Sequence, residues 1–283
     1  MLAQFWSWEG GMRGPEFAAR MARALGDYRA QAIVDMRLQL RVETHMIDDF
    51  PVILRLIEET GIEAVVLNDH LPHAAIRAGK RPPRLTGQAL KAGRSPEAHH
   101  DLIKHLSGRA DEVPEALAQF CADLSARGVR IIGSHDDRTT EARDQFRAMG
   151  ATLAEFPETE EAALAARDAG DPIVLGAPNV VRGGTHDRGI NAAKLFREGA
   201  CSALVSDYHY PALARGAERL GVAGWHAVTR GPAVIMGATD RGGLGPGMRA
   251  DLVVLTQDRS AVLGTMVAGR WAYLRAPLTE RLM

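Results

Sequence analysis

The sequence predicts an α/β protein, a (β/α)8 TIM-type barrel that lacks its first strand and is followed by a remnant of a β-sandwich. Short apolar runs alternate with segments of helical periodicity, which implies parallel strands joined by crossover helices. Near residue 239 this pattern gives way to glycine-rich turns and short strands. We therefore expect a barrel domain over residues 1–238 and a small C-terminal β element over residues 239–283.

The expected barrel strands are apolar runs bounded by turn residues. They cover residues 2–6, 37–43, 63–69, 129–134, 151–156, 172–177 and 202–207. A complete barrel of this type contains about eight strands, so one strand is missing from the pattern.

Helices are expected where apolar residues recur at spacings of three and four. They cover residues 15–28, 50–59, 112–127, 140–149 and 158–169, and Ser95 with Pro96 opens another. Two segments are expected to be loops: the basic stretch 73–94 and the glycine-rich stretch 178–189.

Composition excludes several classes of function. The 283 residues are 46% hydrophobic with a net charge of −1, and no basic block stands out, so we expect no nucleic-acid surface. No apolar run approaches the ~18 residues of a membrane helix, and the N-terminus lacks a signal-peptide pattern. Cys121 and Cys201 are isolated and apolar in context, which fits core positions in a reducing cytoplasm. Homo-oligomerisation is left open.

Ionisable or amide side chains follow nearly every expected strand. Because the carboxyl ends of parallel strands meet at one edge, these side chains should converge there. Buried unpaired charges are costly, whereas a divalent cation neutralises carboxylates and binds neutral imidazoles. We expect a metal centre with zinc, manganese or iron, the alternative being a polar rim without metal. The strand-end residues are Glu43 with His45, Asp69 with His70, His135 with Asp136 and Asp137, Glu155, Asn179, and Asp207 with His209.

The remaining histidines and the glycine-rich loop allow weaker inferences. His73, His99, His100, His105 and His226 are interpreted as solvated or capping residues. The stretch GAPNVVRGGTHDRG follows a strand and precedes a helix, and its glycines would let backbone N–H groups approach a phosphate. The equally weighted alternative is a tight loop whose arginines form ion pairs.

Several motifs occur together in a recognisable order. They are LRVETH, VLNDH, GSHDD, EFPETEEAA, GAPNVVRGG, LVSDY and the closing ADLVVL. With them the chain resembles the amidohydrolase superfamily, and within it the diphosphatases of phosphonate metabolism. The resemblance implies a hydrolase that converts alpha-D-ribose 1-methylphosphonate 5-triphosphate into the 5-phosphate and pyrophosphate in the C–P lyase pathway.

The resemblance also implies roles for individual residues. One or two divalent ions, zinc by preference, would be held by Glu43, His70, His135 and Asp207, with His186 a further ligand or substrate contact. Asp207 would act as the general base. The ribose-phosphonate substrate would contact Asn179, Arg182, Gly183, Gly184, Arg188 and Tyr208.

The chain departs from the family at its start. Family members begin with β-sandwich strands and a first barrel strand that ends in a His-x-His or His-x-Asp motif, whereas the first histidine here is His45. We therefore expect a chain truncated at its N-terminus. Two alternatives remain: a cyclic amidase or deaminase of the same superfamily, and a non-catalytic relic.

Overall fold

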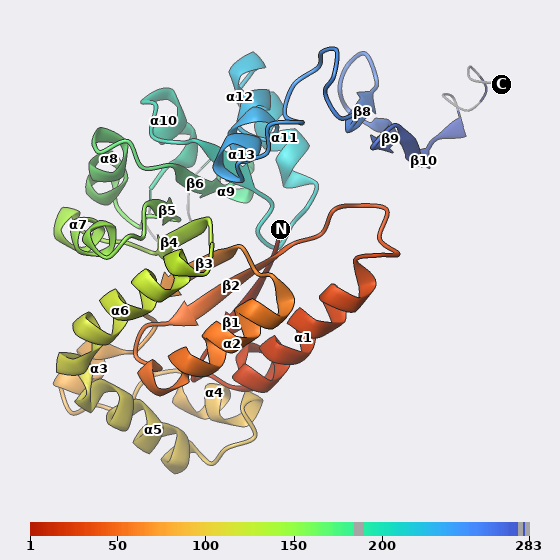
Figure 1. Cartoon of the computed structure of the whole chain (residues 1–283). Coiled ribbons are helices and arrows are strands. Elements are labelled where there is room, and N and C mark those ends of the chain that lie inside the picture. The colour runs from red at the N-terminus through yellow and green to blue at the C-terminus, as the bar shows by residue number, and fades with distance from the viewer. Residues whose placement is uncertain (184–189, 277–279, 281–283) are drawn as a thin grey trace. The chain divides into compact units, whose positions relative to one another are not determined.

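The structure, a computed structural model, describes residues 1–183, 190–276 and 280 (Figure 1). The chain divides into two compact units. The first comprises residues 1–30 and 36–157, and the second comprises residues 31–35 and 158–283. The division thus falls after Pro157, and the boundary expected at residue 239 stays a prediction.

Five parallel strands form the sheet of the first unit. They are β1 (Leu2–Trp6), β2 (Leu38–Glu43), β3 (Ala64–Asn68), β4 (Ile131–His135) and β5 (Leu153–Glu155). Each strand pairs with the next along the chain. Glu43 is level with Asn68, and His135 is level with Glu155, so the polar residues at the strand ends lie along one edge of the sheet.

Amphipathic helices pack against this sheet. They are α1 (Pro15–Tyr28), α2 (Phe50–Thr60), α6 (Val113–Ala126) and α7 (Thr140–Ala148). Proline stands in the first turn of α1, α2 and α6, where its missing N–H costs nothing. Leu40 and Leu67 of the sheet pack with Ile53 and Phe120 of the helices, and all four side chains are almost fully buried.

The stretch 73–94 is not the loop that its basic composition suggested. It contains α3 (His73–Arg77) and α4 (Leu85–Lys91), followed by α5 (Pro96–Gly108), which begins at Ser95 as expected. Figure 1 shows the three helices gathered beyond the carboxyl ends of β1 to β3. Trp8 and Leu71 form a small apolar cluster with residues of these helices, among them the buried Leu85. This packing explains why the segment is helical although its composition suggested a loop. Three 3-10 turns complete the unit: η1 (Gly11–Arg13), η2 (Ile47–Asp49) and η3 (Ala110–Glu112).

Within its described residues, the second unit contains two parallel strands, β6 (Ile173–Gly176) and β7 (Ala203–Val205). Its helices are α8 (Glu160–Asp168), α9 (Ala177–Arg182), α10 (Ala192–Arg197), α11 (Ala212–Arg219), α12 (Val222–His226) and α13 (Arg230–Ile235). The first part of the expected glycine-rich loop is therefore helical. Pro178, in the first turn of α9, has the backbone angle that starts a helix, and Gly183 ends it with φ at 82°.

The chain ends in a small antiparallel sheet, as expected. It consists of β8 (Leu252–Leu255), β9 (Val262–Val267) and β10 (Arg270–Leu274), with β9 in the middle. Together with the seven parallel strands of the described residues, it confirms the predicted α/β class.

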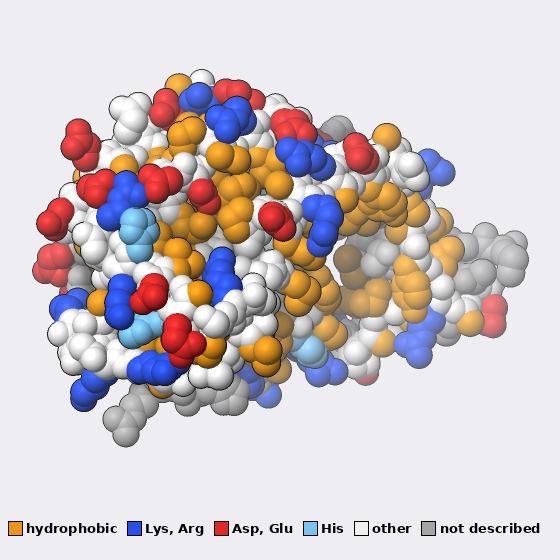
Figure 2. Space-filling view, turned by 90° about the horizontal axis from the view of Figure 1, so that it is seen from below, with side chains coloured by type: hydrophobic (Ala, Val, Ile, Leu, Met, Phe, Trp, Pro, Cys, Tyr) orange, Lys and Arg blue, Asp and Glu red, His pale blue; other side chains and the backbone are white. Residues whose placement is uncertain are grey.

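Two surface properties bear on the expected partners. Every described helix is too short or too polar to cross a lipid bilayer. Acidic and basic side chains are interspersed over the face shown in Figure 2, in keeping with the net charge of −1. The expectation that nucleic acid is not a ligand stays a prediction.

Candidate metal centre

His70, directly beyond β3, is held by Glu43 at the end of β2. Its Nδ1 atom lies 2.6 Å from Glu43 Oε1, and its backbone N–H donates to Oε2 over 3.1 Å. The indole N–H of Trp8 donates to the same Oε2 atom over 3.2 Å. Glu43 is 1% exposed, so this buried carboxylate gains its stabilisation from these three donors. The His70 ring is thereby fixed, with Nδ1 occupied and Nε2 free to bind elsewhere.

His135, the last residue of β4, is held in the same way by the neighbouring strand. Its Nδ1 atom lies 3.0 Å from Oε2 of Glu155 at the end of β5. Arg41 lies 3.0 Å from that oxygen, and the Gln39 amide donates to the other carboxylate oxygen over 2.9 Å. A histidine whose Nδ1 is bonded to a carboxylate is the common arrangement of a metal ligand that binds through Nε2.

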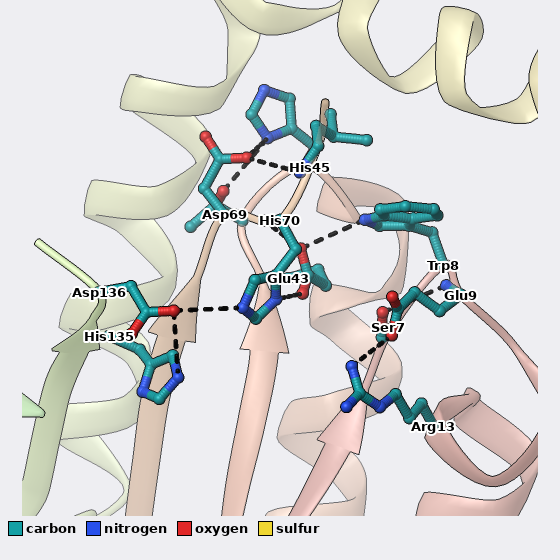
Figure 3. Close-up of polar contacts among 12 residues, drawn as sticks. Ser7, Trp8, Glu9, Arg13, Glu43, His45, Asp69, His70, His135 and Asp136 are labelled. Carbon is teal, nitrogen blue, oxygen red and sulfur yellow. Dashed lines mark hydrogen bonds and ion pairs between the residues drawn. The ribbon is translucent and has the colours of Figure 1, made fainter. Parts of the chain in front are cut away.

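Both free Nε2 atoms face one carboxylate, that of Asp136 (Figure 3). Asp136 Oδ2 lies 3.6 Å from His70 Nε2 and 3.5 Å from His135 Nε2. These separations are too long for hydrogen bonds. They are close to the ~3.3 Å between two ligand atoms of a tetrahedral zinc ion with bonds of about 2 Å.

The donor set therefore fits a divalent cation. His70, His135 and Asp136 each offer one ligand atom within 4.8 Å of the others. Two imidazoles and one carboxylate are the ligands of a catalytic zinc site, which keeps a position open for water or substrate. The His70 and Asp136 side chains are 29% and 33% exposed, so such an open position can be reached from solvent.

The backbone at these strand ends is unusual. Asp136 has φ at 63° and Phe156, which follows β5, has φ at 54°. Aspartate tolerates this left-handed region, but a bulky residue such as phenylalanine rarely adopts it. Such strained residues concentrate at functional sites, where the surrounding structure compensates for their cost. Here the N–H of Asp136 donates to the Glu155 carbonyl over 3.1 Å, which fixes the turn.

The electrostatics of the cluster favour positive charge between its carboxylates. Burial would lower the pKa of His70, but Asp136 and Glu43 together raise it to about 10. Burial would likewise raise the pKa of Glu155, yet His135 and Arg41 hold it below its usual value. A divalent cation bound here would replace the proton on His70, because a metal ligand must be a neutral imidazole.

The remaining candidate residues belong to the second unit. Asn179 uses its amide on the backbone, donating to the Ile190 carbonyl and accepting from the Ala192 N–H, each over 3.0 Å. Arg182 donates to the hydroxyl of Tyr208, and both side chains are exposed. Gly183 caps α9, and Asp207 is exposed with φ at 50°. Gly184, His186 and Arg188 lie outside the described residues.

The sequence interpretation found Glu43, His70 and His135, and the structure brings all three together. It placed Asp136 among the strand-end residues but did not assign it as a ligand, because the GSHDD motif does not show which side chains the carboxylate faces. It also missed Trp8 as the partner of Glu43, since the two residues are 35 positions apart. The assigned roles of Glu43 and Asp207 as direct ligands stay predictions, although Glu43 is already bonded to His70 and Trp8.

No protein-family model matches the sequence. A curated relative does match: over 249 residues the chain is 30% identical to the alpha-D-ribose 1-methylphosphonate 5-triphosphate diphosphatase of Escherichia coli (strain K12). The chain is similar in sequence to this diphosphatase. The match covers 83% of the chain and 65% of the diphosphatase, so the chain spans slightly less than two thirds of that protein.

The similarity to a diphosphatase of this kind, expected from the sequence motifs, is thus confirmed. Among solved structures, an uncharacterized metal-dependent hydrolase from Pyrococcus furiosus shares 13% identity at a TM-score of 0.46. The superposition covers 81% of this chain and 52% of that one. A likeness of this size supports no conclusion about function.

Proposed function

We propose that the chain is a metal-dependent hydrolase that acts on a phosphoric anhydride. Its substrate would be alpha-D-ribose 1-methylphosphonate 5-triphosphate, which it would convert into the 5-phosphate and pyrophosphate during phosphonate catabolism. The observation that carries the proposal is the convergence of His70 Nε2 and His135 Nε2 on Asp136. The 30% identity to a diphosphatase of that name supports the choice of substrate.

The residues suited to hold the cation are His70, His135 and Asp136, with Glu43 and Glu155 orienting the two imidazoles. Their nitrogen and oxygen donors, without thiolate, favour zinc, with manganese or iron as substitutes. When bound, such an ion lowers the pKa of a coordinated water towards ~7 and polarises a phosphoryl oxygen.

The other candidate residues would act on the substrate itself. Asp207 accepts the proton of the attacking water, as a general base does. Arg182 and Arg188 bind phosphate oxygens, because guanidinium groups make strong charge-assisted hydrogen bonds to phosphate. Tyr208 keeps the Arg182 side chain in place through its hydroxyl. Asn179, Gly183 and Gly184 contribute further contacts to the substrate, and the Asn179 amide also ties Ile190 and Ala192 to α9.

The test is a substrate assay on the purified chain loaded with zinc. Phosphorus NMR should show the 5-triphosphate converted into the 5-phosphate and pyrophosphate. A panel of cyclic amides and nucleobases, assayed in parallel, covers the alternative of an amidase or deaminase. Turnover of a panel member with none of the triphosphate would replace the proposal, and inactivity on everything would favour the non-catalytic alternative.

A further inference from the structure

A second group of histidine and aspartate side chains lies beside the candidate metal centre and shares no residue with it. His45 follows β2, Asp69 follows β3 and His73 is the first residue of α3. One ring nitrogen of each histidine and one Asp69 oxygen all lie within 4.8 Å of one another. Figure 3 shows His45 beside Asp69, and His70 turned instead towards Glu43 and Asp136.

We propose that His45, Asp69 and His73 form a second divalent-cation site. The site goes beyond the proposed hydrolase activity and does not depend on it. Two imidazoles and one carboxylate are again a zinc-type donor set with one position open. His45 is only 7% exposed, whereas about a third of the Asp69 and His73 side chains is exposed, at 35% and 32%. The open position therefore faces solvent on the side of Asp69 and His73.

An ion pair alone explains only part of the cluster. His73 Nε2 lies 2.8 Å from both oxygens of Asp69, four positions earlier in the chain, which is the distance of an ordinary hydrogen bond. His45 is different, because its Nδ1 atom lies 3.7 Å from Asp69 Oδ1, beyond hydrogen-bond range. That distance is close to the ~3.3 Å that separates two ligand atoms on one tetrahedral zinc ion.

Packing supports the same arrangement. The centroids of the His45 and His73 rings lie 5.3 Å apart, so the buried His45 ring and the partly exposed His73 ring lie side by side near Asp69. The His45 ring also forms a hydrogen bond with the Thr44 hydroxyl, which lies 3.2 Å from Nδ1. A cation here would join the ends of β2 and β3 to the first turn of α3.

The decisive experiment separates the two sites by mutation and measures zinc alone. The metal-stripped full chain is titrated with Zn²⁺ against a chromophoric chelator, first as wild type and then as the variant His70→Ala/His135→Ala. That double variant should still bind one ion. Adding His73→Ala to it should weaken this binding at least about 10- to 100-fold, the loss that even an outer-shell partner causes. Adding His105→Ala, an exposed histidine on α5, should change nothing.

Two results would overturn the site. One is a double variant that binds no zinc although its circular dichroism spectrum is native, and the other is a triple variant with His73→Ala that binds zinc as tightly as the double variant.

A second experiment applies if the double variant unfolds. The wild type and the single variants His73→Ala and His105→Ala are then loaded with Co²⁺ in place of zinc, and their absorption spectra are compared. Loss of one of two tetrahedral Co²⁺ signals in His73→Ala alone supports the site, and an unchanged spectrum contradicts it. Neither readout involves turnover, so an inactive chain that binds the second ion would refute the proposed function and leave this site intact.

Discussion

His135 Nδ1 lies 3.0 Å from Glu155 Oε2, and the two residues end neighbouring parallel strands at the same level of the sheet. The Glu155 carboxylate thus fixes the His135 imidazole through Nδ1, and Arg41 balances the negative charge of Glu155. Parallel pairing alone accounts for this contact, since residues in register on adjacent strands lie side by side. The orientation of a candidate ligand is therefore set by the pairing of the two strands.

Replacing Glu155 with glutamine should weaken zinc binding by about 10- to 100-fold, because the amide neither holds a charge nor fixes the ring proton of His135 in the same way. The measurement is a Zn²⁺ titration against a chelator. Glu115→Gln, on the exposed surface of α6, is the matched control and should bind as the wild type does. Equal affinities for the two variants would remove Glu155 from the site.

Replacing Asp207 with asparagine should leave zinc bound but slow pyrophosphate release by at least about 100-fold, the contribution of a general base. Zinc content and the release rate are measured on the same sample. Asp27→Asn, an exposed aspartate at the end of α1, provides the control. A variant of Asp207 that works at the wild-type rate would exclude this residue from the proton transfer.

Replacing Arg143 with methionine should destabilise the first unit by about 3–5 kcal/mol, since it leaves Asp137 buried without a cation. Arg143 is fully buried and lies 3.0 Å from Asp137 Oδ2, and both contact the Ser134 hydroxyl. Urea unfolding gives the free energy. Exposed Arg55→Met should change it by less than about 0.5 kcal/mol. A cost for Arg143→Met as small as that of the control would contradict the prediction.

The two cysteines should be unreactive in the native chain. Burial raises the pKa of the Cys121 thiol to about 11 and that of the Cys201 thiol to about 12. At pH 8 only a very small fraction of either is the reactive thiolate. Labelling with a disulfide reagent should therefore be slow until denaturant is added. Rapid labelling of the native chain would show that one of these thiols is accessible.

Strand periodicity was enough to predict the fold class and the edge at which the site forms. The strand ends also identified His70 and His135, because a histidine after a buried strand can only lie at that edge. The helices at 73–77 and 85–91 were missed, since they are short and owe their stability to packing against Trp8 and Leu71.

His99 shows the limit of the approach for single side chains. The sequence placed it on a helix and suggested a solvated residue, but its ring is fully buried and lies 5.6 Å from that of Trp8. Nothing local distinguishes it from its exposed neighbours on α5. Asp136 was placed at the strand end but not assigned as a ligand for a related reason, because the sequence does not show its left-handed backbone or that its carboxylate faces both histidines.

The buried pair of Arg143 and Asp137 has a consequence for surveys of natural or engineered variants. It anchors the same strand end that carries His135, so loss of Arg143 would reach the neighbouring imidazole through Ser134 and Asp137. In a screen scored by growth or turnover, this helix position would rank with the residues that touch the substrate. Only a refolding assay run beside the screen would distinguish variants that lose folding stability from variants that lose catalysis.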